Sequence, residues 1–374
     1  MERASVHEDE VLKQEIYSML TRAYVWLFRS AKPGGHWIEV RSTSLAGLCL
    51  VHVLPMNSRW ISGVQTWLSR RKTNMAEDKA CWGEELWDTS MALIALLRLG
   101  APASDEVVQA ALKWELELYD CNGHRNWHDE PWETSWTILA LLEAALPRVI
   151  PPEAYQAARW LIGLQDKSGR IVAPHYTAYF IQIYAKFKKR GKLEHETEFS
   201  RAKSQAVKYL MANLDPDRLW TGEAWSNGQI LWSLLADPDI ELETNKARTI
   251  ADWFLRQQLE EGSWAHDAED TASGVLGLYE LIRRLESKTV RNNTELDQLL
   301  YGTLRKNIEV PAFVAGRWQW EREEDGTIRV AVHVHPRDQK IAGAVVLTVS
   351  TVSLVITFWE QLEGLFRALL GALG

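Results

Sequence analysis

The sequence repeats itself six times at an interval of about 45 residues. The copies share a turn containing Gly and Trp, then an acidic residue, a Thr and a small residue that begin an apolar segment with helical spacing. An interval of this length is that of one helical hairpin with its two connections. The repeat therefore predicts six hairpins, and the equivalent residues at the start of their second helices are Thr43, Thr89, Thr134, Thr177, Asn227 and Thr271.

Each copy predicts an amphipathic outer helix followed by an almost wholly apolar inner helix. Inner segments such as MALIALL offer no polar face to water, so a closed ring of hairpins is favoured over an open superhelix. The fold class predicted for residues 8–286 is therefore an all-α (α/α)6 toroid. Its inner helices are expected over 43–53, 89–99, 134–145, 177–187, 227–235 and 271–285, and its outer helices over 11–30, 60–69, 107–119, 152–164, 201–214 and 246–259.

The charge balance argues against a nucleic-acid-binding protein. The chain has a formal net charge of −8 and a pI near 5.8, and no basic stripe is present. Three Cys residues are too few for a disulfide framework, which indicates a reducing compartment. The first residues are charged and lack the apolar run of a signal peptide, so the toroid is expected in the cytoplasm.

The residues beyond the repeats follow other patterns. A helical extension is expected over 287–316, and the alternation over 317–335 around Asp325 and Gly326 predicts a β-hairpin with a tight turn. Two strands alone are marginally stable. The hairpin is therefore expected to lean on the toroid or to pair with a second copy of the chain.

An uncharged run of 19 residues occupies 341–359. As a helix it would extend roughly 28 Å, close to the roughly 30 Å hydrocarbon core of a bilayer. It predicts a single-pass C-terminal transmembrane helix, followed by an amphipathic tail over 360–374, and its small and hydroxyl residues suit a homo-oligomer. Arg337 and Lys340 before the run agree with a cytoplasmic toroid. A buried core helix or strands are the alternative, because β-branched residues are frequent.

Two segments near the end of the repeats carry a family resemblance. The segment QLEEGSW over 258–264 resembles the Q-x-x-x-G-x-W repeat of the terpenoid cyclases and protein prenyltransferases. The segment DAEDTA over 267–272 resembles the D-x-D-D-T-A motif of cyclases such as squalene-hopene cyclase, with Glu at the middle acid. The resemblance covers residues 8–286 and implies the same toroid.

The resemblance also implies a catalytic acid. The residue that matches the proton donor of the cyclases is Glu269, whose carboxyl would be held neutral in an apolar, aromatic cavity so that it can protonate an alkene. Asp267 or His175 is the expected catalytic partner, with His266 as a further candidate.

The residue two positions before each Thr equivalent is expected at one mouth of the toroid. Three copies have Trp there and three have an ionisable residue, a set that suits a cation, a sugar or an anionic head group. These residues are Arg41, Trp87, Trp132, His175, Trp225 and Glu269.

Acids also stand immediately before the Thr, as Asp88, Glu133 and Asp270. Asp270 is assigned to the substrate-binding site, although an acid in the first turn of a helix also stabilises the helix through its unpaired amides and dipole. A second set of Trp, seven positions before the Thr equivalent, is expected to fill the space between repeats: Trp82, Trp127, Trp220 and Trp264.

The function these patterns favour is a membrane-anchored cyclase that acts on an isoprenoid or polyprenyl lipid, with Glu269 as general acid and the Trp residues stabilising carbocations. The alternative is a non-catalytic toroid that binds a ligand or partner and acts through a membrane-active C-terminal segment, as an oligomer or pore. Glycan hydrolysis is a third possibility and requires a second acid in the mouth, for which Glu84, Glu85 and Glu130 are available.

No cofactor and no metal are expected. The D-D-x-x-D motif that holds diphosphate-bound metal is absent. The His pairs His124/His128 and His333/His335 have spacings that could hold a metal, but such pairs are more often solvated.

Overall fold

The computed structural model describes residues 2–76, 78–83, 85–120, 125–145, 150–191 and 196–287, together with three short strands beyond residue 317. The chain divides into two compact units, residues 1–307 and 308–374.

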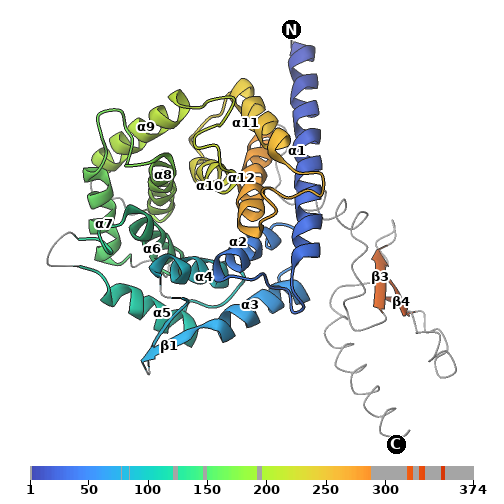
Figure 1. The fold of residues 1–374 in the computed structure, drawn as a ribbon, viewed down its shortest axis with the longest axis horizontal. Helices are drawn as coiled ribbons and strands as arrows, with labels where there is room; N and C mark the ends of the chain where they lie inside the picture. The colour runs from blue at the N-terminus through green and yellow to red at the C-terminus, as the bar shows by residue number, and fades with distance from the viewer. Residues whose placement is uncertain are drawn as a thin grey trace, which may run out of the picture. The chain divides into compact units, whose positions relative to one another are not determined.

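Twelve helices fill the described part of the first unit and alternate between an outer and an inner layer (Figure 1). Each odd-numbered helix is an outer helix, and each even-numbered helix is the inner helix that follows it. The prediction of an all-α toroid of six hairpins is confirmed. The helices are α1 (Glu2–Ser30), α2 (Val40–Leu50), α3 (Arg59–Arg71), α4 (Leu86–Arg98), α5 (Glu106–Glu117), α6 (Pro131–Ala144), α7 (Pro152–Gly163), α8 (Pro174–Lys189), α9 (Glu196–Ala212), α10 (Ala224–Leu234), α11 (Thr244–Gln257) and α12 (Ala268–Ser287).

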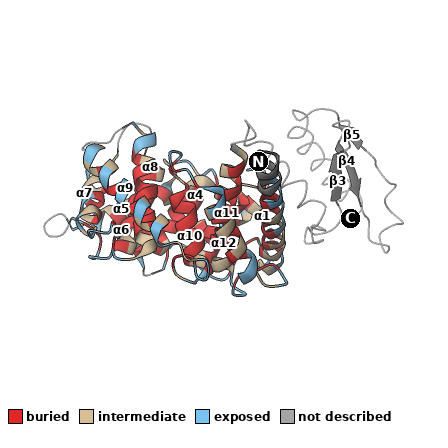
Figure 2. Ribbon diagram, turned by 90° about the horizontal axis from the view of Figure 1, so that it is seen from above, coloured by how far each residue is buried: buried red, intermediate tan, exposed pale blue. Residues whose placement is uncertain are grey.

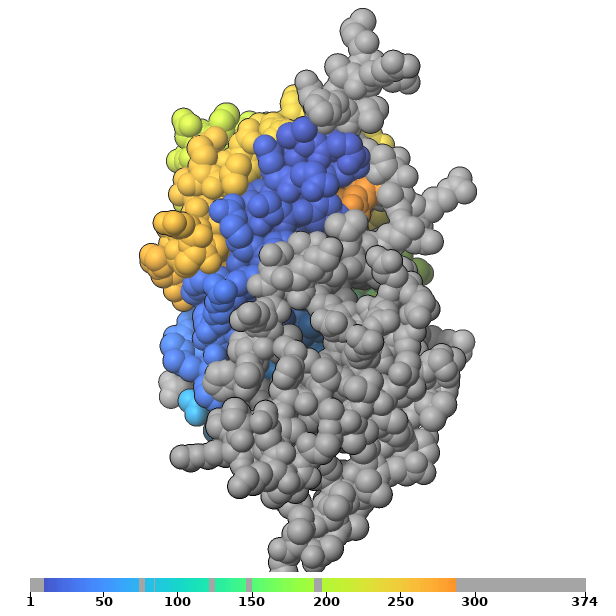
Figure 3. Space-filling model, turned by 90° about the vertical axis from the view of Figure 1, so that its right-hand side faces the viewer, coloured from blue at the N-terminus to red at the C-terminus, as the bar shows by residue number. Residues whose placement is uncertain are grey.

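The ring closes because the last inner helix packs against the first hairpin. α12 contacts both α1 and α2, and α1 also contacts α11. Figure 3 shows α1, in blue, directly beside the yellow and orange helices of the last repeat. The junction is held by hydrogen bonds from Gln258 Nε2 to the carbonyl of Met19 (2.9 Å) and from Tyr17 to Glu286.

The repeated Thr closes the turn in front of each inner helix. In five repeats its Oγ1 accepts a hydrogen bond, 2.9 to 3.2 Å long, from the backbone N–H six or seven residues earlier. In the remaining repeat Asn227 Oδ1 accepts the equivalent bond from Trp220, at 3.1 Å. Asn can replace Thr here because its short side chain supplies the same acceptor, and its Nδ2 donates to the carbonyl of Arg218.

The second set of Trp residues is structural. Each indole is at most 7% exposed, and its Nε1 donates to a carbonyl near the end of the preceding outer helix, over 2.7 to 3.0 Å. These bonds satisfy carbonyls that a helix end leaves unpaired. The four residues are Trp82, Trp127, Trp220 and Trp264.

The centre of the ring, called the lumen below, is filled by side chains of the inner helices. α6 and α10 are not neighbours in the ring, yet Trp136 and Trp232 approach within 6.4 Å between ring centroids. Figure 2 shows the inner helices buried along most of their length. The residues two and five positions after the Thr equivalents are at most 5% exposed: Leu45, Leu48, Met91, Ile94, Trp136, Leu139, Tyr179, Gln182, Gln229, Trp232, Ser273 and Leu276.

One element in the second repeat was not expected from the sequence. Between α3 and α4 the chain forms a short antiparallel hairpin of β1 (Thr73–Ala76) and β2 (Lys79–Cys81). β2 packs against α5, so the hairpin extends the outer layer.

In the second unit β3 (Trp318–Arg322) pairs antiparallel with β4 (Ile328–Val332), Trp318 opposite Val332, where the alternation predicts a hairpin. A third strand, β5 (Leu347–Val349), pairs antiparallel with β4. β5 lies inside the segment predicted to cross a membrane, and these three residues are extended and not helical.

The rest of that segment, the helical extension after Ser287, the turn at Asp325 and Gly326, and the tail over 360–374 lie outside the described residues. Among the helices that the structure describes, none combines the length and apolar character needed to cross a bilayer.

Candidate functional site

The residues two positions before the Thr equivalents meet at one end of the inner helices, called the mouth below. Arg41 on α2 joins the two sides of the ring closure: its Nη1 lies 3.8 Å from Glu269 Oε2 on α12, and its Nε lies 3.4 Å from Asp88 Oδ1 on α4. Its guanidinium carbon lies 4.0 Å from the ring centroid of Trp87. The sequence prediction that the six positions share one mouth therefore agrees with these contacts.

Trp132 is the centre of an aromatic cluster in the mouth. Its ring centroid lies 5.3 Å from Trp87, 5.5 Å from His175 and 5.7 Å from Trp225, in each case with an edge-to-face geometry. Trp225 is on α10, which is separated from α6 by α8, so this contact joins two inner helices that are not neighbours. Edge-to-face pairs are the arrangement that ring quadrupoles favour. Four inner helices are thereby joined through one indole.

The Glu269 carboxyl is largely withdrawn from water, with 19% of its side chain exposed. Burial raises its pKa, Arg41 opposes this, and the negative charges of Asp267, Asp270 and Glu39 raise it further, to about 7. An ordinary Glu is ionised at neutral pH. Glu269 therefore keeps its proton to a higher pH than an ordinary Glu does.

Asp267 is exposed and directs its carboxylate to the backbone, not to Glu269's carboxyl. Its Oδ1 accepts from the N–H of Glu269 (2.7 Å) and from the N–H of Asp270 (3.2 Å), as an N-cap of α12 does. This bond fixes the first turn of α12 and hence the direction of Glu269. The influence of Asp267 on the Glu269 proton is electrostatic.

Asp270 anchors the neighbouring inner helix. Its Oδ1 accepts from the backbone N–H of Trp225 at 3.0 Å, so it satisfies an unpaired amide at the start of α10. Burial raises the pKa of Asp270 to about 6, while the bond from Trp225 lowers it. The helix-stabilising role weighed for Asp270 from the sequence is thus visible, but it acts on α10 and not on Asp270's own helix.

His175 lies within the aromatic cluster, 4.1 Å from Tyr176 and 5.9 Å from Trp225 between centroids. Its Nδ1 is buried without a hydrogen-bond partner in the described structure. Burial lowers its pKa to about 4, so the imidazole is neutral at pH 7. No hydrogen bond or ion pair among the described residues joins it to Glu269. The two proposed catalytic groups therefore share the mouth without direct contact.

Asp88 belongs to the mouth, although the sequence analysis gave it only a helix-stabilising role. Its side chain is 18% exposed, and burial raises its pKa to about 6 against the opposing effect of Arg41. Its position one residue before the repeat Thr, as for Asp270, was the available signal.

The remaining candidate acids and metal ligands from the sequence do not lie together in one site. His128 pairs with Glu133 at 2.6 Å, Glu85 accepts from Trp87 Nε1, and Glu130 is exposed. The described residues contain no group of three His, Cys, Asp or Glu arranged to hold a metal. Glu84, His124, His333 and His335 lie outside the described residues.

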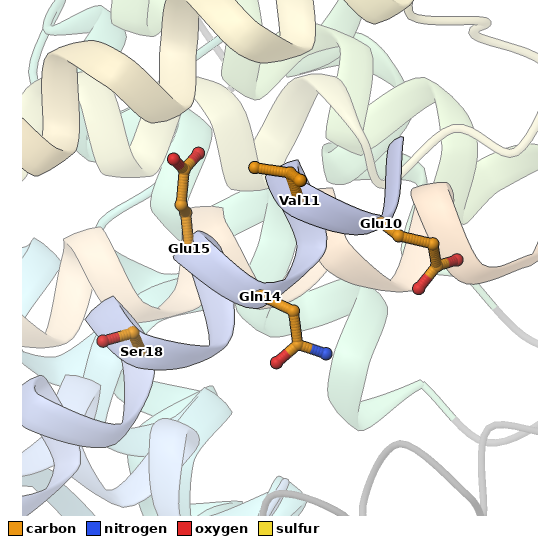
Figure 4. Close-up of a pocket in the computed structure, with 5 residues that line it drawn as sticks. All are labelled: Glu10, Val11, Gln14, Glu15 and Ser18. Carbon is orange, nitrogen blue, oxygen red and sulfur yellow. The ribbon is translucent and has the colours of Figure 1, made fainter. Parts of the chain in front are cut away.

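A hollow of about 490 Å³ on the outside of the ring is lined, among the residues that the structure describes, by α1 (Figure 4). Its residues point along one helix face and bring no titratable groups into contact across a cavity. It is therefore not the candidate site. The lining residues are Glu10, Val11, Gln14, Glu15 and Ser18.

The sequence matches no protein-family model and no curated protein. A variant of the type II terpene cyclase MstE from Scytonema, solved with its substrate geranylgeranyl dihydroxybenzoate, superposes with a TM-score of 0.56 at 14% identity, over 74% of this chain and 99% of MstE. This chain has the fold of a type II terpene cyclase. A ligand-free MstE variant gives the same TM-score at 15% identity, over the same shares of the two chains. A protein from Actinoplanes gives 0.54 at 14% identity, over 71% of this chain and 99% of that one.

The cyclase fold accounts for the toroid predicted from the repeat.

Proposed function

We propose that the chain is a terpenoid cyclase-like protein in which Glu269 donates a proton to an alkene of an isoprenoid or polyprenyl lipid. The observation that carries the proposal is a mostly buried carboxyl, whose pKa burial raises, at the edge of a mouth lined by Trp87, Trp132 and Trp225. The fold shared with the type II terpene cyclase MstE supports it.

The proposed reaction balances within the site. The Glu269 O–H bond breaks, and the π electrons of the terminal alkene form a new C–H bond, which leaves a tertiary carbocation. Further alkenes of the same chain attack the cation in turn, and a final loss of a proton to water gives a neutral product that is an isomer of the substrate. Indole faces stabilise the cations. Arg41, 3.8 Å away, stabilises the carboxylate that proton donation leaves behind.

A second candidate function is favoured by the filled lumen. An isoprenoid chain that folds inside the ring would need the space that Trp136, Tyr179 and Trp232 occupy. A toroid that only binds a ligand at the mouth needs no such space. In that case Arg41 would keep Glu269 paired, and the ring would serve as a receptor for a ligand or partner, coupled to a membrane-active C-terminal segment.

The deciding experiment compares the wild-type protein with Glu269→Gln and the control Glu260→Gln, an exposed acid in the preceding turn. Each is incubated with squalene, farnesyl diphosphate, geranylgeranyl diphosphate and geranylgeranyl dihydroxybenzoate, and extracts are searched by mass spectrometry for products isomeric with the substrate. We expect a product from the wild type and the control, and a loss of at least about a hundredfold in Glu269→Gln, the scale of a general acid. Product formation by the wild-type protein should fall as pH rises above about 7, because Glu269 must be protonated to donate a proton.

The absence of product with every substrate, with all three proteins folded by circular dichroism, would overturn the cyclase proposal in favour of the receptor. Product formation that survives in Glu269→Gln would remove Glu269 as the acid while keeping the cyclase.

Attachment to a membrane, with the toroid on the cytoplasmic side, is a further part of the proposal and rests on the uncharged sequence over 341–359. We expect the full chain to float with liposomes in a density gradient and a chain ending at residue 340 to remain at the bottom. Equal flotation of the two proteins would contradict the anchor.

A further inference from the structure

The guanidinium of Arg41 is surrounded by one aromatic ring and three carboxylates in the mouth. It lies over the face of Trp87, at 4.0 Å, and has the carboxylates of Asp88 (3.4 Å), Glu39 (3.8 Å) and Glu269 (3.8 Å) around its edge. An aromatic face with carboxylates at its rim is the arrangement that recognises organic cations. Arg41 is a cation that the chain itself supplies to this arrangement.

The mouth carries more negative charge than Arg41 can balance. Acids stand four positions before the Thr equivalent in five of the six repeats, all exposed, and Arg41 is the one Lys or Arg at the positions one, two and four before the Thr. These exposed acids raise the pKa of the partly buried acids Asp88 and Asp270. Glu39 and Glu85 act on Asp88, and Glu223 acts on Asp270, although burial is the larger cause in both cases. This outer acid ring consists of Glu39, Glu85, Glu130, Glu223 and Asp267.

Two indoles of the mouth carry no cation from the described part of the chain. Trp132 and Trp225 are partly exposed, and among the described residues no Lys or Arg stacks on either ring. Both belong to the aromatic cluster that includes Trp87, the ring on which Arg41 lies. The outer acid ring adds negative charge to the same mouth.

We infer that the mouth binds a ligand with an alkylammonium or guanidinium head group, in cation–π contact with Trp132 and Trp225, and discriminates against phosphate and diphosphate head groups. The inference rests on the mouth being the ligand site, as proposed above, and holds whether the ligand is converted or only bound. A negative head group would enter against the outer acid ring, which lowers both its rate of approach and its affinity. For a cyclase this means a neutral or amine-bearing isoprenoid and not a diphosphate.

Three probes with the same apolar chain separate head-group charge from hydrophobic contact: hexyltrimethylammonium, hexanol and hexyl phosphate. Binding to the full chain is followed by tryptophan fluorescence and calorimetry at low and high salt. We expect the ammonium to bind at least about tenfold more tightly than the phosphate at low salt, and the difference to shrink as salt screens the acids. Equal or tighter binding of hexyl phosphate would overturn the inference.

Variants test the named groups. Arg41→Met removes the internal cation, and we expect it to bind the ammonium more tightly, while Arg159→Met, an exposed Arg on α7, leaves affinity unchanged. The double variant Glu130→Gln/Glu223→Gln should weaken ammonium binding and not hexanol binding. Both acids are exposed and make no side-chain capping bond, so the fold should survive. Trp225→Leu should remove most of the preference for ammonium over hexanol.

The outcomes are independent of catalysis. Ammonium binding without any cyclised product would overturn the cyclase proposal and leave the head-group inference standing. A cyclised product from geranylgeranyl diphosphate, with no preference for the ammonium probe, would overturn the head-group inference and leave the cyclase proposal standing. An ammonium affinity unchanged in Arg41→Met and in the Glu130→Gln/Glu223→Gln variant would show that the probe binds elsewhere and would also overturn it.

Discussion

Replacement of Gly228 by Ala is expected to lower the free energy of unfolding by more than about 3 kcal/mol, beyond the usual cost of overpacking. A Cβ at Gly228 would stand 2.3 Å from the carbonyl oxygen of Ser273 and 2.6 Å from the backbone nitrogen of Gly274. These are backbone atoms of α12, so no side-chain rotation relieves the clash. α10 and α12 would have to move apart, and the bond from Trp225 N–H to Asp270 would be strained with them.

Gly163→Ala is the matched control. Gly163 is also helical, at the end of α7, and a Cβ there meets nothing within 4 Å. We expect this variant to gain about 0.5 to 1 kcal/mol, because Ala loses less backbone entropy than Gly. Urea denaturation followed by circular dichroism measures both. A Gly228→Ala protein as stable as the wild type would show that α10 and α12 are not packed this closely.

Glu115→Gln is expected to remove a large pH dependence of stability. Glu115 on α5 is fully buried, its Oε1 accepts from Ser90 Oγ at 2.6 Å, and its Oε2 has no hydrogen-bond partner among the described residues. Burial raises its pKa to about 8 from a model-compound value of 4.5, against the lowering effect of the Ser90 bond. The folded protein therefore holds a proton that the unfolded chain has released.

The direction follows from that difference in bound protons. Below about pH 4.5 Glu115 is protonated in both the folded and the unfolded state, so its ionisation does not change the free energy of unfolding. As pH rises from there towards 8, only the unfolded state releases the proton, and the free energy of unfolding falls progressively. The loss across this window is on the order of 5 kcal/mol. Gln cannot ionise, so the stability of the variant relative to the wild type should rise with pH and level off above about 8.

The control for this titration is Glu117→Gln, two residues further along α5, where the carboxylate is exposed and pairs with Lys79. Unfolding free energies from urea titrations at several pH values should show a slope close to that of the wild type for Glu117→Gln and a flatter one for Glu115→Gln. Identical slopes for the wild type and Glu115→Gln would contradict a buried neutral carboxyl.

Much of the toroid could be predicted because its repeat depends on short-range chemistry. The Thr that closes each turn and the Trp seven positions before it act within one hairpin, so they recur at a fixed interval in the sequence. Closure followed from the wholly apolar inner helices. Hairpin β1–β2 could not be predicted, because it falls in a connection where the repeat imposes no pattern.

The mouth was predicted as a set of positions but not as a set of contacts. The spacing from each Thr places Arg41, Trp87 and Glu269 on the same level of the ring, yet it does not say that Arg41 lies between Glu269 and Asp88. That contact depends on α12 meeting α2 at the ring closure. The filled lumen was also beyond the sequence, because helical periodicity gives the direction of Trp136 and not how far it reaches across the ring.

The packing of α1 against α12 has a consequence for the way the chain is made. Tyr17 and Glu286, which bond to each other, are 269 residues apart, and contacts of such separation slow folding. On the ribosome the buried face of α1, with Leu12, Ile16 and Leu20, emerges before the other helices of the ring, and α11 and α12, against which α1 packs, are synthesised last among them. Nascent chains that end before residue 268 should therefore expose this face and be the ones that chaperones hold.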